Sequence, residues 1–178
     1  MMEKKKIWEL GRLSKYEYRE IDKLPLVLVV DNVRSLNNIG SLFRTCDAFL
    51  VEKIILCGIS ACPPSPEIHK TALGAEESVK WEYYTSTTEA IGDLRSAGYE
   101  LCVLEQVKNS CLLQDFSVKP FNRYAVIIGN EIDGVQQSVV DKSDVCLEIP
   151  QYGTKHSLNV SVSAAIALWH FFIGLKQL

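Results

Sequence analysis

Several common features are missing from this chain of 178 residues. None of its six cysteines forms a C-x-x-C pair, and three histidines are too few and too scattered to complete a zinc site, so we expect no metal. The charged residues at the start are not followed by the apolar stretch of a signal peptide, which predicts free thiols in a reducing cytoplasm. The loops G-x-G-x-x-G and G-K-S/T are also absent, which excludes the common nucleotide-binding fingerprints.

An excess of positive charge is missing as well, since 19 Lys/Arg stand against 22 Asp/Glu. The formal net charge is −3, which excludes a uniformly basic nucleic-acid surface but not a local basic patch. Residues 1–23 carry seven Lys/Arg against five Asp/Glu, and the remainder carries twelve against seventeen. We therefore expect a basic N-terminal helical arm over residues 1–23, with its helix over residues 8–21, followed by one domain over residues 24–178. The arm is either a solvated terminus or a phosphate-binding segment.

One segment imitates a membrane helix. Residues 158–175 contain no Asp, Glu, Lys or Arg, which reaches the length of a membrane span. Polar residues interrupt the segment, and no cluster of positive charge flanks it. We predict instead a helix buried against the domain core or a partner subunit, and no membrane association.

Apolar runs alternate with helical patterns along the rest of the chain. The runs at residues 26–30, 99–104 and 124–128 are apolar on both faces, as central parallel strands are. The pattern predicts an α/β domain with a mostly parallel sheet and helices on both faces. Ligands bind beyond the carboxyl ends of such strands, and polar clusters follow the strands there.

The first cluster is Asn38, Gly40 and Arg44, in the stretch NNIGSLFRT. Asn38 stands where a side chain would cap a helix at about residues 39–50. Arg44 lies in an apolar segment, where a guanidinium needs a carboxylate or phosphate partner. An internal ion pair with Glu131 and a ligand phosphate are equally good interpretations of this segment.

The second cluster is the stretch IGNEIDG, which contains Gly129 and Glu131. Glycine permits positive φ and the close approach of a ligand. Glu131 is expected at the start of the following helix, where the dipole favours a carboxylate. A plain β–α turn explains the stretch equally well.

The third cluster runs from Ile149 through Ser157 and Leu158 to Asn159. Asn159 opens the long apolar helix, so helix capping is its simplest role. Backbone groups of this stretch could hold a flat apolar ring between Ile149 and Leu158.

Together the clusters read N-x-G-x-x-x-R, G-N-E-x-x-G and I-P-Q-x-G-x-x-x-S-L-N-V. In this order and spacing they resemble the three motifs of the SpoU (TrmH-type) RNA 2′-O-ribose methyltransferases of the SPOUT superfamily, over about residues 26–175. Residues 70–75 (KTALGA) also resemble a family element. The family commonly has Asp-Pro where this chain has Ser35 and Leu36, which leaves the rigidity of that loop open.

The resemblance implies a C-terminal deep trefoil knot and homodimers that meet through the C-terminal helix. It also implies S-adenosylmethionine as the cofactor. The positions that match the family's cofactor-binding residues are Leu104, Gly129, Ile149 and Leu158.

The resemblance also implies the catalytic residues: Asn38, Arg44, Glu131, Ser157 and Asn159. Since Arg is always protonated, we expect Arg44 to bind the phosphate next to the target ribose and not to act as a simple base. Glu131 would orient Arg44 or the nucleotide, and Asn38 would hold its own loop. Ser157 and Asn159 would hydrogen-bond the ribose or the cofactor.

The expected substrate is RNA, with tRNA favoured over rRNA because the chain has no room for an accessory domain of the ribosomal type. Guanosine in the D-loop is the favoured site, because the short basic arm resembles that of members which methylate it, and the wobble position, which minimal family members modify, is the alternative site. A non-catalytic knotted RNA-binding module and an enzyme acting on a small nucleotide are the alternatives.

Overall fold

Seven strands form one parallel sheet in the computed structural model, which describes residues 2–178. The strands stand in the order β3-β2-β1-β6-β4-β7-β5, and every neighbouring pair is parallel. Their bounds are β1 Leu24–Asp31, β2 Val51–Cys57, β3 Trp81–Tyr84, β4 Tyr99–Leu104, β5 Cys111–Leu112, β6 Arg123–Ile128 and β7 Val145–Glu148.

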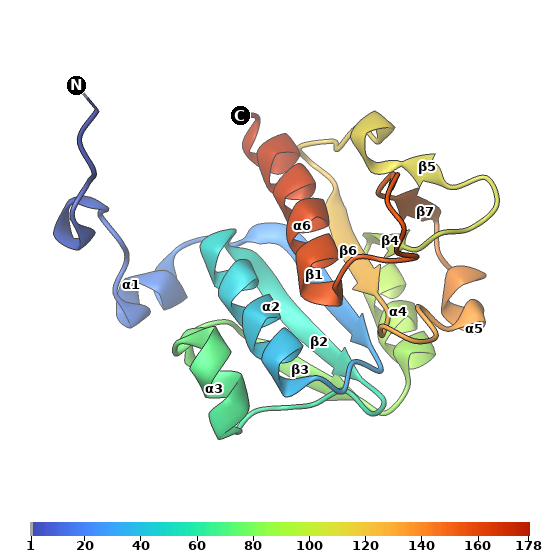
Figure 1. Ribbon diagram of the computed structural model, residues 1–178, viewed down its shortest axis with the longest axis horizontal. Coiled ribbons are helices and arrows are strands. Elements are labelled where there is room, and N and C mark those ends of the chain that lie inside the picture. The colour runs from blue at the N-terminus through green and yellow to red at the C-terminus, as the bar shows by residue number, and fades with distance from the viewer. Residues whose placement is uncertain (1) are drawn as a thin grey trace.

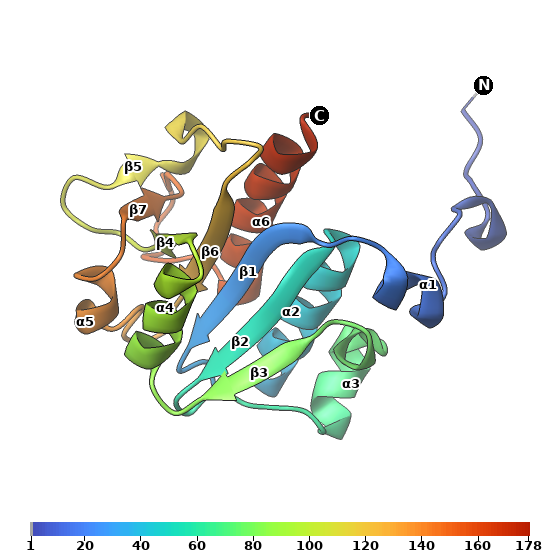
Figure 2. The same cartoon turned by 180° about the vertical axis from the view of Figure 1, so that it is seen from behind.

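Helices cover both faces of the sheet. Helices α2, α3 and α6 lie on one face (Figure 1), and α4 and α5 lie on the other (Figure 2). The bounds are α1 Lys15–Glu20, α2 Leu36–Ala48, α3 Pro66–Ala72, α4 Thr87–Ser96, α5 Gln137–Val140 and α6 Val160–Lys176. Short 3-10 turns occupy Ile7–Glu9, Ala75–Glu77 and Leu113–Asp115. The predicted α/β architecture is confirmed.

Strand β1 shows how the two faces are filled. Leu28 and Val30 pack in the core cluster that contains α2 and α6, whereas Val27 and Val29 pack in the cluster that contains α4. Successive side chains of a strand point to opposite faces, so a strand covered on both sides must be apolar throughout. The continuous run LVLVV is the consequence.

The order of the strands reverses between β1 and β6. The chain builds outward from β1 through β2 to β3, and β6, β4, β7 and β5 stand on the other side of β1. Parallel α/β sheets bind ligands outside the carboxyl ends of their strands at such a point. The first polar cluster follows β1 and the second follows β6, so adjacent strands bring these two clusters to one edge.

Most predicted elements agree with the structure, and the terminal arm is the main exception. The predicted helix over residues 8–21 is wrong in extent, because helix α1 begins only at Lys15. Gly11 has a φ of +57°, and Ser14 caps α1 by accepting a hydrogen bond from the amide of Glu17. The three prolines within residues 61–67 predict a loop there, and this is wrong for the last two residues, because helix α3 begins at Pro66, where proline is tolerated.

Helix α6 is one-sided in its packing. Its buried residues, such as Ala164, Leu168 and Phe171, contact the core, as predicted for an uncharged helix. Val162, Ile166 and Trp169 are between 40% and 49% exposed.

All six cysteines are free thiols. The trefoil knot stays a prediction from the resemblance.

Within residues 2–178, no helix combines the length and the apolar character that a membrane span requires.

Candidate active site

Ser35 caps helix α2. Its Oγ accepts a hydrogen bond from the amide of Asn38 at 3.3 Å, so the prediction that Asn38 is the cap is wrong. Ser35 and Leu36 stand where the resembled family has Asp-Pro, and the hydroxyl of Ser35 holds the first turn of the helix through this contact. Because the cap lies one turn earlier, the side chain of Asn38 is available for other contacts.

Asn38 connects the three polar clusters. Its Nδ2 donates a hydrogen bond to Oε1 of Glu131, and its Oδ1 accepts one from Nδ2 of Asn159 at 3.1 Å. Asn159 also caps α6, as predicted, because its Oδ1 accepts from the amide of Ser161 at 2.9 Å. The clusters after β1, after β6 and before α6 thus meet through three side chains.

The turn after β6 is closed by its own polar groups. Oδ1 of Asn130 accepts hydrogen bonds from the amides of Ile132 and Asp133, both at 2.9 Å. A Cβ on Gly129 would lie 2.0 Å from the backbone carbon of Gly134, so Gly129 is needed for the turn to close. Helix α5 begins only at Gln137, so the predicted place of Glu131 at a helix start is wrong.

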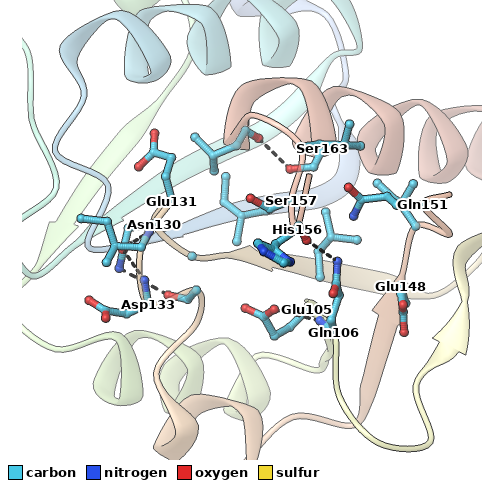
Figure 3. A pocket seen from close by; sticks show the side chains of 18 of the residues that line it. Glu105, Gln106, Asn130, Glu131, Asp133, Glu148, Gln151, His156, Ser157 and Ser163 are labelled. Carbon is cyan, nitrogen blue, oxygen red and sulfur yellow. Dashed lines mark hydrogen bonds between the residues drawn. The ribbon is translucent and has the colours of Figure 1, made fainter. Parts of the chain in front are cut away.

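A cavity of about 320 Å³ opens beside this turn. All four cofactor candidates line it, namely Leu104, Gly129, Ile149 and Leu158. Glu131 and Ser157 line it as well. In Figure 3, Asn130 and Asp133 lie on one side of the cavity, Glu148 and Gln151 lie on the other, and His156 and Ser157 lie between them.

Glu105 and Gln106 hold the walls of this cavity together. No sequence motif singles out these two residues. Oε2 of Glu105 accepts a hydrogen bond from the amide of Val135 at 2.9 Å, which ties the loop after β4 to the turn after β6. Nε2 of Gln106 donates to the carbonyl oxygen of His156 at 3.0 Å, which ties the same loop to the last one. In the sequence, these two residues could have been found by their position directly after the buried run YELCVL, at the carboxyl end of a predicted strand.

Asp31 is a third residue of this region that no sequence motif singles out. It is fully buried at the end of β1. Its carboxylate accepts hydrogen bonds from Oγ1 of Thr87 at 2.6 Å and from the amide of Gln136 at 2.8 Å. A buried carboxylate is tolerated when hydrogen bonds replace its hydration. Asp31 therefore fixes the turn after β6 against β1 and α4.

Gly40 explains how the KTALGA element contributes to the site. A Cβ on Gly40 would lie 2.0 Å from Oγ1 of Thr71 and 2.4 Å from the carbonyl oxygen of Ile68. The hydroxyl of Thr71 also donates to the carbonyl oxygen of Asn37 at 3.1 Å. Helices α2 and α3 thus touch at this glycine, and the contact fixes the helix that carries Asn38 and Arg44.

Arg44 is the one catalytic candidate that stands apart. It is exposed, and it forms no ion pair with Glu131 or with any other residue between 2 and 178. The internal ion pair that the sequence left open is therefore excluded. Arg44 stands about 9 Å along α2 from Asn38. It lines a second cavity, which shares no lining residue with the first.

One group of side chains has metal-ligand chemistry in the described part of the chain. The ligand atoms of His69, Glu76 and Glu77 lie within 4.8 Å of one another. Nδ1 of His69 is 2.5 Å from Oε1 of Glu76, and Lys15 forms a salt bridge with Glu77. His69 and Glu76 thus pair with each other and Glu77 pairs with Lys15, and none of the three lines the first cavity.

Comparison with known proteins places this geometry in a family. Residues 25–169 match the model of the SpoU rRNA Methylase family. A TrmH family protein from Staphylococcus aureus strain MSSA476 is 29% identical over 174 residues, which cover 90% of this chain and 67% of the relative. The 23S rRNA (guanosine-2′-O-)-methyltransferase RlmB of Neisseria meningitidis serogroup B is 30% identical over 148 residues, or 81% of this chain and 56% of the relative.

Solved structures show the same architecture. The AdoMet-bound rRNA methyltransferase from Sinorhizobium meliloti superposes with a TM-score of 0.78 at 25% identity, over 86% of this chain and 59% of that one. The TrmH/SpoU tRNA modifying enzyme of A. aeolicus superposes with a TM-score of 0.81 at 24% identity, over 92% and 81% of the two chains. With most of its length matched by the family model, the chain belongs to the SpoU rRNA methylase family.

Proposed function

We propose that this protein transfers a methyl group from S-adenosylmethionine to the 2′-oxygen of a ribose in RNA. The observation that carries the proposal is the contact of Asn38 with both Glu131 and Asn159, beside the cavity lined by the cofactor candidates. Three segments far apart in the chain converge there. The Neisseria relative is named as a 23S rRNA (guanosine-2′-O-)-methyltransferase, and this name supports the choice of oxygen.

The first cavity fits the proposed cofactor. Its volume of about 320 Å³ lies at the lower end of the range for small-molecule sites. Leu104, Ile149 and Leu158 offer apolar surface for a flat ring, and Glu105 and Gln106 offer polar groups for the charged end. When bound, S-adenosylmethionine supplies a methyl group on a positively charged sulfur.

The chain's own residues position the methyl acceptor. Arg44 binds the phosphate next to the target ribose, which holds the sugar and lowers the pKa of its hydroxyl, and the phosphate assists the loss of the proton. Glu131 and Asn38 orient the nucleotide at the cavity mouth. Oδ1 of Asn159 is engaged by Ser161, so Asn159 acts chiefly through its amide hydrogens. Ser157 lines the cavity wall, and its hydroxyl has no hydrogen-bond partner within residues 2–178.

We further propose that the complete site forms between two copies of the chain. In one copy, Arg44 and the cofactor candidates border different cavities, although a methyl acceptor must reach both. The exposed face of α6 supports a homodimer. Val162, Ile166 and Trp169 lie on it, and Trp169 packs against Phe49 with ring centroids 5.6 Å apart. An apolar helix face of this kind is typical of an interface.

The proposed substrate is tRNA, with a D-loop guanosine as the site, and 23S rRNA is the alternative because RlmB acts on it. The test combines calorimetry with S-adenosylmethionine, methyl transfer to total RNA and mapping of 2′-O-methyl sites in RNA from a deletion strain. We expect binding, transfer and the loss of one site in tRNA. Cofactor binding without transfer to any RNA would favour a non-catalytic RNA-binding module. Transfer to free nucleosides would favour an enzyme for small nucleotides.

A further inference from the structure

The second cavity lies between the N-terminal arm and helix α2. Its volume is about 460 Å³. Residues 11–15 and Tyr18 border it on the arm side, Arg44 and Asp47 border it from α2, and residues 72–75 and Ser78 close it. In Figure 1, α1 lies at the edge of the molecule, away from α5. The cavity is therefore separate from the proposed cofactor site.

The arm is held in place against the domain. Nη2 of Arg19 donates to the carbonyl oxygen of Glu77 at 3.1 Å, and Lys15 forms a salt bridge with the carboxylate of Glu77. Ser14 and Glu17 form a capping box at the start of α1. Arg12 stands two residues before Ser14, so the contacts of α1 bring this end of the arm to the cavity that Arg12 lines.

The charges at the cavity are not balanced by the protein. Among residues 2–178, the side chains of Arg12 and Arg44 have neither a salt bridge nor a hydrogen bond, whereas Lys15 is engaged by Glu77. Asp47 is the one carboxylate at the wall. Burial raises the pKa of Asp47, and the nearby charges of Lys23 and Arg12 partly offset that rise. Two guanidinium groups without a protein partner at one cavity favour the binding of an anion there. The planar guanidinium group can donate two parallel hydrogen bonds to a phosphate.

Tyr18 adds a polar group that lacks a partner. It is 5% exposed, it lines the cavity, and its buried hydroxyl has no hydrogen-bond partner within the described chain. Burial raises the pKa of this hydroxyl, so it keeps its proton and can donate. A buried hydroxyl without a partner carries an unmet desolvation cost, and an acceptor bound in the cavity that Tyr18 lines would relieve it.

We propose that this arm cavity binds one RNA phosphate, which Arg12 of the arm and Arg44 of α2 hold together. The inference rests on the proposed function, since it takes RNA as the substrate and Arg44 as its phosphate ligand. Arg12 is then a positioning residue that helps place the target ribose. The arm thus makes a specific contact with one phosphate and does more than attract RNA through its net positive charge.

A double-mutant cycle on RNA affinity tests the proposal. Arg12→Ala and Arg44→Ala should each weaken tRNA binding about tenfold and lower its log–log salt slope by about 0.7–0.9. If both side chains hold one phosphate, the second substitution should add less than about threefold once the first is made. Lys142→Ala is the control. Lys142 is exposed and follows α5, which lies at the opposite end of the molecule from α1, so this substitution removes the same charge far from the cavity. Its effect should add fully to that of Arg44→Ala.

Additive losses for Arg12→Ala and Arg44→Ala would overturn the shared phosphate. So would an Arg12→Ala protein that changes its oligomeric state and not its RNA affinity. Either result leaves the proposed function standing, provided that the wild-type protein methylates RNA. If the wild type binds RNA but transfers no methyl group, the proposed function fails, and the cycle still reports on the cavity.

Inorganic phosphate provides a second probe that needs neither RNA nor activity. We expect phosphate to raise the melting temperature of the wild-type protein, and Arg12→Ala and Arg44→Ala to abolish that rise. Asp47→Asn should increase the rise, because it removes the carboxylate that repels the anion. An equal effect of phosphate on all four proteins would contradict a phosphate site in this cavity.

Discussion

Asn38 and Glu131 lie 93 positions apart in the chain and share a direct side-chain hydrogen bond from Nδ2 to Oε1. The contact forms because β1 and β6, which precede the two residues, are adjacent parallel strands. It joins two family motifs within one chain. It also leaves the carboxylate of Glu131 exposed at the cavity mouth, where a nucleotide can reach it.

Glu131→Gln separates the positioning role of this residue from the role of its charge. The amide oxygen of the glutamine still accepts from Asn38, so we expect an unchanged melting temperature. Methyl transfer should fall about tenfold or more because the charge is lost, a loss of about 1.4 kcal/mol in transition-state stabilisation. Single-turnover methylation and thermal unfolding measure the two quantities. A fully active Glu131→Gln beside an inactive Glu131→Ala would reduce Glu131 to a support for Asn38.

Arg44→Ala should lower methyl transfer by a factor of about 10² or more, because the ribose is no longer placed accurately. Since Arg44 is exposed and unpaired within residues 2–178, the melting temperature and the cofactor affinity should hardly change. Arg44→Lys should not restore activity, because an ammonium lacks the planar two-point contact with phosphate. Near-normal turnover in a stable Arg44→Ala protein would contradict the assignment.

Leu158→Arg should abolish S-adenosylmethionine binding, because it places a charged side chain in the apolar part of the first cavity. Ile59→Arg is the matched control. Ile59 is 62% exposed and lines neither of the two cavities, so this variant should bind the cofactor normally. Calorimetry on both folded variants decides, and equal affinity would place the cofactor elsewhere.

Co-expression of Arg44→Ala with Leu158→Arg tests the site shared between copies. Each variant alone should be inactive. In a mixed dimer, one site would combine an intact Arg44 with an intact cavity, so the mixture should recover about a quarter of wild-type activity. A mixture as inactive as its components, with mixed dimers demonstrated by affinity tags, would mean that each site lies within one copy.

Gly40→Ala should destabilise the fold by about 1–3 kcal/mol, since its Cβ would collide with Thr71 and with the backbone of Ile68. Gly92→Ala is the control within α4. Its Cβ would meet nothing within 4 Å, so the better helix propensity of alanine should stabilise the protein by about 0.5–1 kcal/mol. Denaturant unfolding measures both changes. Similar effects at the two positions would contradict the close contact of α2 with α3.

Trp169→Glu should shift the protein from dimer to monomer in analytical ultracentrifugation, because it replaces the large aromatic ring on the exposed face of α6 by a charge. Trp8→Glu, which makes the same change at an arm residue that is 78% exposed, should leave the assembly unchanged. A wild-type protein that sediments as a monomer at every concentration would rule out the dimer.

The sequence by itself determined the sheet and the order of the motifs. The runs LVLVV, YELCVL and YAVII are apolar on both faces, and such runs have few stable places other than the middle of a covered parallel sheet. Asn159 before a long uncharged segment likewise determined the start of α6. These features depend on neighbours in the chain, so local patterns suffice to predict them.

Tertiary structure decided what the polar side chains do. Asn38 and Ser35 are both good helix caps, and only the packing of α2 beside the turn after β6 gives the cap to Ser35 and leaves Asn38 to meet Glu131. Arg44 lies in an apolar segment of the sequence, yet the 3.6-residue period of α2 turns its side chain away from the core, and it is exposed. Gly40 and Gly129 are required by backbone segments that approach them in space. Such contacts are long-range, and a one-dimensional pattern does not contain them.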